Sequence, residues 1–137
     1  MYAPSNAINS PQNPAKPGNP RDAIAVKPHE QAAGFAAEAY FKVKNIPGVA
    51  IATSGPGGQN FVTSIANCFY DSVPGIFITG QVKTQFQRPS KKVRQIGFQE
   101  TDIVDICKSI TKYCKMILPE DDFIEEIKSA YLESITG

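Results

Sequence analysis

Residues 28–60 read PHEQAAGFAAEAYFKVKNIPGVAIATSGPGGQN and contain the clearest structural signals of the chain. Apolar positions between 31 and 44 recur at intervals of three and four, which predicts a helix that the Asn-Ile-Pro-Gly run at 45–48 ends. The following Val-Ala-Ile-Ala-Thr run is apolar on both faces, as a buried parallel strand requires. Glycine and proline at 55–58 allow a sharp turn into the next helix. The acid Glu30 and this turn therefore fall at one sheet edge, where such sheets bind ligands.

The rest of the chain continues the alternation of strands and helices. We expect strands at 23–26, 49–53, 75–79 and 113–118, helices at 31–44, 56–72, 103–110 and 123–135, and a long polar loop at 80–99 as a lid or interface segment. In the helix after the glycine turn, one side of the helix carries the apolar residues Phe61, Ile65, Cys68 and Phe69. This order predicts an α/β fold, a parallel sheet with helices on both faces. Five prolines at 4, 11, 14, 17 and 20 predict that residues 1–22 are disordered or irregular, so the domain occupies 23–137.

Composition argues against several classes of partner. The net charge is +1 and 20% of the residues are charged, which gives no strong field for nucleic acid or an anionic membrane. No apolar run reaches the roughly 18 residues of a membrane span, and no signal peptide is visible. The three cysteines, at 68, 107 and 114, fit no metal spacing and predict reduced, buried thiols in a cytoplasmic protein.

Four motifs, in order, carry a family resemblance. They are His29-Glu30-Gln31-Ala32-Ala33, Thr53-Ser54-Gly55-Pro56-Gly57 with Asn60, Ile78-Thr79-Gly80-Gln81-Val82, and Phe98-Gln99-Glu100-Thr101-Asp102-Ile103-Val104. From about residue 24 to 137 the chain resembles the N-terminal pyrimidine-binding domain of thiamine-diphosphate enzymes, in the acetolactate synthase-like family. Compared with that fold, we expect the chain to be incomplete at both ends. The Val-Arg-Gln-x-Gly run before Phe98 resembles the branch of polysaccharide and deoxysugar biosynthesis, which calls acetolactate itself and FAD binding into question.

The resemblance implies a role for each site residue. Glu30 would activate thiamine diphosphate through the ring nitrogen of its aminopyrimidine, and Pro56 and Asn60 would line the pyrimidine pocket. Gln99 would reach the substrate, and Phe98 would border the same space. The chain has no Gly-Asp-Gly motif for Mg²⁺ and diphosphate, so these would bind to a separate domain or partner subunit. The implied assembly is a homodimer with the active site at the interface.

The residues also allow other interpretations. Glu30 could cap the helix or interact with its dipole, and Phe98 could be a core residue. The glycine turn could cradle phosphate in a nucleotide-binding domain, although it matches neither the P-loop nor the G-x-G-x-x-G pattern. His29 is the only histidine, which excludes a His-rich metal site and favours a structural role.

The expected protonation state of Glu30 depends on whether water reaches the site. The helix dipole stabilises the Glu30 anion by about 0.3–1 kcal/mol, whereas closure at an interface can raise a carboxyl pKa by as much as ~3–5 units. A closed site would therefore keep a proton available. The implied reaction is decarboxylation of a 2-keto acid, with pyruvate expected, and transfer of the two-carbon unit to an acceptor carbonyl. Whether this chain is an enzyme stays open, and the alternative is a truncated, inactive fragment or a non-catalytic partner subunit.

Overall fold

Three parallel strands form a sheet in the described part of the chain. The structure is a computed structural model that describes residues 24–25 and 29–136, so the predicted irregular segment 1–22 lies outside the described residues. The strands are β1 (Ile24–Ala25), β2 (Gly48–Ala52) and β3 (Gly75–Thr79), in the order β1-β2-β3. Val49 of β2 lies opposite Ile24 on one side and Ile76 on the other. The expected parallel sheet is confirmed.

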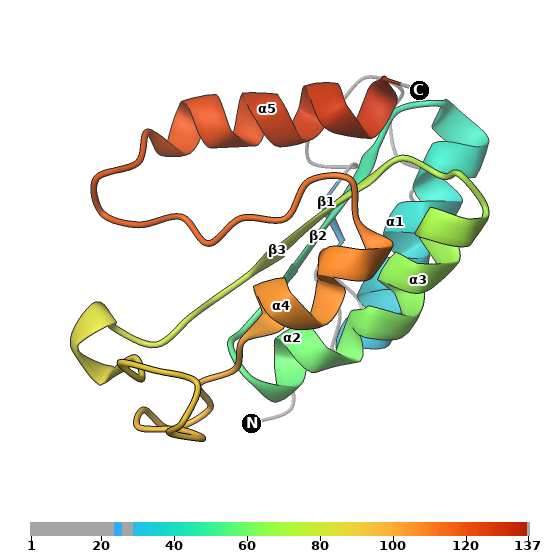
Figure 1. Ribbon diagram of the computed structural model, residues 1–137. Helices are drawn as coiled ribbons and strands as arrows, with labels where there is room; N and C mark the ends of the chain where they lie inside the picture. Colours follow the sequence, from blue (N-terminus) through green and yellow to red (C-terminus); the bar gives the residue numbers. More distant parts are fainter. Residues whose placement is uncertain (1–23, 26–28, 137) are drawn as a thin grey trace.

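Helices cover both faces of this sheet (Figure 1). The helices are α1 (Glu30–Lys44), α2 (Pro56–Asn60), α3 (Val62–Tyr70), α4 (Ile103–Cys107) and α5 (Phe123–Ile135), with 3₁₀ turns η2 (Thr84–Phe86) and η3 (Lys108–Ile110). The strands run between α5 on one side and α1 with α3 on the other. Within the described part of the chain, no helix is long and apolar enough to span a bilayer.

Small residues bring α1 very close to β2. Ala33, Ala37 and Ala50 are buried in the core together with Phe61 and Ile65. A Cβ on Gly48 would lie 2.2 Å from the carbonyl oxygen of Ala37. This contact fixes the distance between α1 and the sheet. It therefore also fixes where the N-terminus of α1 lies, at the edge where β2 ends.

The helix predicted after the glycine turn is in fact two helices. Phe61 stands at the junction of α2 and α3, fully buried, with its ring edge-on to Phe77 at 5.4 Å between centroids. Ile65 and Cys68 are buried as expected, but Phe69 is 43% exposed and packs against the ring of Tyr70 at the surface. Phe69 therefore does not share the burial of Phe61, Ile65 and Cys68, the residues with which the sequence groups it.

The strand predicted at 113–118 is absent from the described structure, which has no regular element there. Side chains of this segment bond to α5 and the turn before it. Lys115 Nζ donates to Asp121 Oδ1 at 2.9 Å and to Glu126 Oε1 at 2.5 Å, and the Tyr113 hydroxyl also bonds Glu126. These bonds hold the segment along α5, so it does not extend the ladder of β3. The prediction was wrong because the mostly apolar run 113–118 does not reveal such partners elsewhere in the sequence.

Candidate functional site

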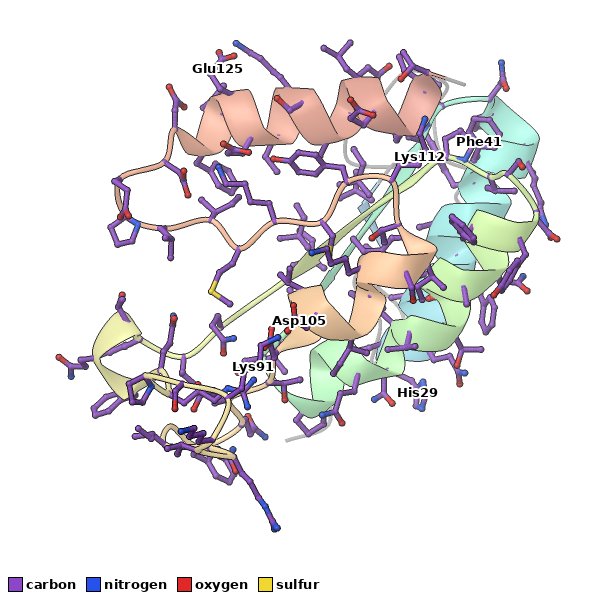
Figure 2. All side chains as sticks on the ribbon, viewed as in Figure 1. His29, Phe41, Lys91, Asp105, Lys112 and Glu125 are labelled. Carbon is purple, nitrogen blue, oxygen red and sulfur yellow. The ribbon has the colours of Figure 1, made fainter. Side chains whose placement is uncertain are left out.

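Glu30 is the first residue of α1, at the sheet edge where β1 and β2 end. His29 occupies the N-cap position without a side-chain capping bond, so Glu30 does not act as the cap. The His29 side chain is exposed and points away from the body of the chain (Figure 2). The carboxylate of Glu30 is thus available for a contact with the neighbouring α2.

Asn60 makes that contact from the last position of α2. Its Nδ2 donates to Glu30 Oε2 at 3.0 Å. A Cβ on Gly57 would lie 3.6 Å from Glu30 Oε1 and 2.8 Å from Thr53 Cγ2. One carboxylate oxygen is therefore held by Asn60, while the other faces Gly57, where a side chain would crowd Thr53. The structure brings together Glu30 and Asn60, two of the residues that the resemblance assigns to the cofactor.

The glycine turn also meets Gln99, a residue far away in the sequence. Gly55 has a φ of 63°, and a Cβ there would lie 2.7 Å from the carbonyl oxygen of Gln99. Gln99 itself has a φ of 64°, which is uncommon for a residue with a side chain. Pro56 is exposed at the first position of α2, where its missing N–H costs nothing. Gln99 and Pro56 therefore flank the turn that faces Glu30.

The surroundings of Phe98 differ from those of Glu30. It is 87% exposed, so the alternative that it is a core residue is wrong. It lines an open hollow of about 570 Å³, whose other lining residues are Gln81, Val82, Lys83, Phe86, Ile96 and Gly97. This hollow belongs to the long loop, and Glu30, Pro56 and Asn60 do not line it.

The electrostatics of Glu30 favour its charged form. Its backbone N–H and the Asn60 amide both stabilise the carboxylate and outweigh partial burial, so its pKa lies below the ordinary value of 4.5. Desolvation does not dominate because the side chain is only half-buried in this chain. Glu30 is therefore an ionised carboxylate at neutral pH, and a closed site would need another group to cover it.

We expect Asn60→Ala to raise the pKa of Glu30 towards its ordinary value, because the mutant loses the Nδ2 donor. Because the pKa of Glu30 is lower in the folded chain, its carboxylate stabilises the folded state above pH 4.5. This stabilisation is lost as the pH falls through the folded pKa. The variant should accordingly lose less stability on acidification over that range. Carboxyl ¹³C NMR titration measures the pKa. Asn67→Ala, which removes an amide from Glu38 of the same helix, is the control that should leave Glu30 unchanged.

The described residues offer little support for a nucleophilic cysteine or a metal site. Cys68 and Cys107 are buried free thiols whose pKa is raised by burial to about 11, which leaves them protonated and unreactive. Among the described residues no group of three or more potential ligands could hold a metal ion. A phosphate at the glycine turn would also meet the Glu30 carboxylate, which argues against the nucleotide-binding alternative.

The sequence motifs missed the connections around Gln99. Thr101 accepts a hydrogen bond from Gln59 Nε2 of α2 at 3.3 Å, and its carbonyl accepts one from Gln81 Nε2 at 2.8 Å. Arg88 of the loop pairs with Asp102 at 2.8 Å. These partners lie 14 to 42 residues apart, so no local pattern could have indicated them.

Comparison with known proteins agrees with this geometry. Residues 20–106 match the family described as thiamine pyrophosphate enzyme, N-terminal TPP binding domain. The chain is 41% identical over 103 residues to acetolactate synthase 2, chloroplastic, of Brassica napus, an alignment that covers 75% of this chain and 15% of that protein. It is 40% identical over 109 residues to the acetolactate synthases of Nicotiana tabacum and Arabidopsis thaliana, covering 80% of this chain and 15% to 16% of theirs. The chain belongs to the thiamine pyrophosphate enzymes and corresponds to the N-terminal TPP-binding domain of their acetolactate synthase-like members.

Proposed function

We propose that this chain supplies the aminopyrimidine side of a thiamine diphosphate site, with Glu30 as the catalytic carboxyl. The observation that carries the proposal is the Glu30 carboxylate, held by Asn60 at 3.0 Å through one oxygen and facing Gly57 with the other. Membership of the family supports the cofactor. Because Gly57 has no side chain, the Oε1 side of the carboxylate is not covered by a Cβ from this turn.

The residues fit the cofactor through hydrogen bonding and shape. A ring nitrogen placed against Glu30 Oε1 would share a proton with the carboxyl, while Asn60 keeps the other oxygen fixed. Covering Glu30 with a ring would exclude water and raise its pKa from the lowered value of the open chain. Pro56 and Asn60 would then flank the pyrimidine. Thiamine diphosphate, when bound, supplies a carbon nucleophile whose proton its own aminopyrimidine helps to remove.

We propose that the whole enzyme decarboxylates a 2-keto acid, pyruvate in the first instance, and transfers the two-carbon unit to an acceptor carbonyl. The three relatives named above are acetolactate synthases and chloroplast proteins, and this chain spans about 15% to 16% of their length. Gln99 and Phe98 would contact substrate.

Diphosphate, Mg²⁺ and a second subunit that completes a dimeric site would come from outside the described residues. A cytoplasmic location and the polysaccharide branch without FAD remain proposals from the sequence.

A reconstitution assay tests this function. The chain is mixed with a diphosphate-binding domain of the family, thiamine diphosphate, Mg²⁺ and pyruvate, and CO₂ release is measured. We expect release only when both proteins are present. Release from neither the mixture nor the separate proteins would support the alternative, in which the chain is an inactive fragment.

A further inference from the structure

The side chain of Glu100 joins the two arms of the long loop at 81–97. Its Oε1 accepts the backbone N–H of Arg88 at 2.6 Å, and its Oε2 accepts that of Ile96 at 2.8 Å. The N–H of Gly97 also bonds the carbonyl of Phe86 at 2.9 Å. One carboxylate thus joins both arms of the loop, and these amides hold its pKa below the ordinary value.

Glu100 is next to the residue that touches the glycine turn. The backbone of Gln99 has a φ of 64° and lies so close to Gly55 that a Cβ there would be 2.8 Å from Gln99 Cβ. A residue with a side chain adopts this conformation only when its surroundings impose it. On the loop side, Glu100 is the group that fixes the chain directly after Gln99.

The next residues extend the same connection to α2 and α4. Thr101 bonds Gln59 of α2, whose own N–H bonds the carbonyl of Gly55 at 3.0 Å. Asp102 caps α4 and pairs with Arg88. Four consecutive residues, 99–102, therefore link the loop to the turn that faces Glu30.

We propose that Glu100 is a positioning residue: by joining the two arms of the 81–97 loop it holds the backbone of Gln99 against the Gly55 turn. It does not contact cofactor or substrate itself. In the proposed enzyme, which this role builds on, it would set where Gln99 and Phe98 meet the acceptor carbonyl. The first part of the test below needs no cofactor, so its outcome is separate from that of the proposed function.

Hydrogen exchange of the full chain tests the positioning role. In Glu100→Ala we expect the amides of Arg88 and Ile96 to exchange roughly tenfold faster, as loss of a hydrogen bond to a charged group implies. The amide of Gln59 should also exchange faster, although it is 41 positions away in the sequence. Faster exchange confined to the loop would overturn the proposal, because Glu100 would then stabilise the loop without positioning Gln99 against the Gly55 turn.

Matched variants separate positioning from general destabilisation. Lys91→Ala removes another loop anchor, the ion pair with Asp105 on α4 (Figure 2), and should leave Gln59 unchanged. Glu100→Gln keeps one acceptor oxygen and should give a smaller effect, which covers the case in which the alanine variant does not fold. Equal acceleration at Gln59 by Lys91→Ala and Glu100→Ala would overturn the proposal.

The assembled enzyme gives a second readout of the same role. Glu100→Ala should raise KM for the acceptor about tenfold and raise the Kd for thiamine diphosphate by a smaller factor, because Gln99 would contact the substrate itself, whereas the turn with Pro56 and Asn60 loosens only through Gln99. Equal losses in both constants would indicate general damage and overturn the proposal. Failure of the proposed function would instead appear as absent turnover in the wild-type enzyme.

Discussion

Replacing Glu30 by glutamine is expected to reduce turnover of the 2-keto acid by at least about a hundredfold, the lower range for loss of a group that transfers a proton in the reaction. Glutamine has the same shape and can still accept from Asn60, but its amide cannot share a proton with the ring nitrogen of the cofactor. The effect should fall mainly on kcat, because the shape of the pocket is unchanged. Steady-state kinetics of the reconstituted enzyme measures both constants.

Glu38→Gln is the matched control on the same helix. Glu38 is 5% exposed, accepts from Asn67 at 3.1 Å and pairs with Lys42 at 2.5 Å, so it resembles Glu30 in having an asparagine partner. Its substitution should lower stability while leaving kcat close to that of the wild type. Comparable kcat losses in the two variants would contradict a catalytic role for Glu30.

Gly48→Ala is expected to destabilise the fold by about 3 kcal/mol, the upper end of the usual cost of overpacking. The new Cβ would lie 2.2 Å from the oxygen and 2.6 Å from the Cα of Ala37. Both are backbone atoms of α1, so no side-chain rotation can relieve the clash, and the helix must move away from β2. Urea unfolding measures the change. The same movement would displace Glu30, so cofactor binding should weaken in parallel.

Gly34→Ala provides the comparison for this effect. Its Cβ would lie 1.9 Å from Ser64 Oγ and 2.6 Å from Ser64 Cβ, which are side-chain atoms. Adding Ser64→Gly removes both atoms, and the double variant should recover part of the lost stability. No second substitution of this kind can help Gly48→Ala. A Gly48→Ala chain as stable as the wild type would disprove the close contact between α1 and β2.

The parts of the fold that the sequence predicts are those set by neighbouring residues. The helical spacing before Lys44, the two-sided apolar run of β2 and the glycine turn each depend on a short window, and together they place Glu30 and Asn60 at one edge. The false strand at 113–118 shows the opposite case. Its geometry depends on Lys115 meeting Glu126, a contact that only the folded chain creates.

The same distinction applies to the candidate site. The resemblance predicts Gln99 as a site residue, but its positive φ and its contact with Gly55 depend on the loop that Glu100 closes. A glutamine gives no local sequence signal for this conformation. The lowered pKa of Glu30 could not be predicted either, because it results from hydrogen bonds of its own backbone N–H and of the Asn60 amide, and the second of these forms only in the folded chain.

Proton uptake on cofactor binding shows whether Glu30 is the carboxyl that meets the cofactor. Thiamine diphosphate and Mg²⁺ are titrated calorimetrically into the reconstituted enzyme near pH 5, in two buffers with different ionisation enthalpies. The wild type should take up a proton on binding, because Glu30 changes from an open carboxylate with a lowered pKa to a covered one with a raised pKa. Glu30→Gln should bind without that uptake. Identical uptake in the two proteins, or no binding to the wild type, would contradict the assignment of Glu30 as the carboxyl that faces the cofactor.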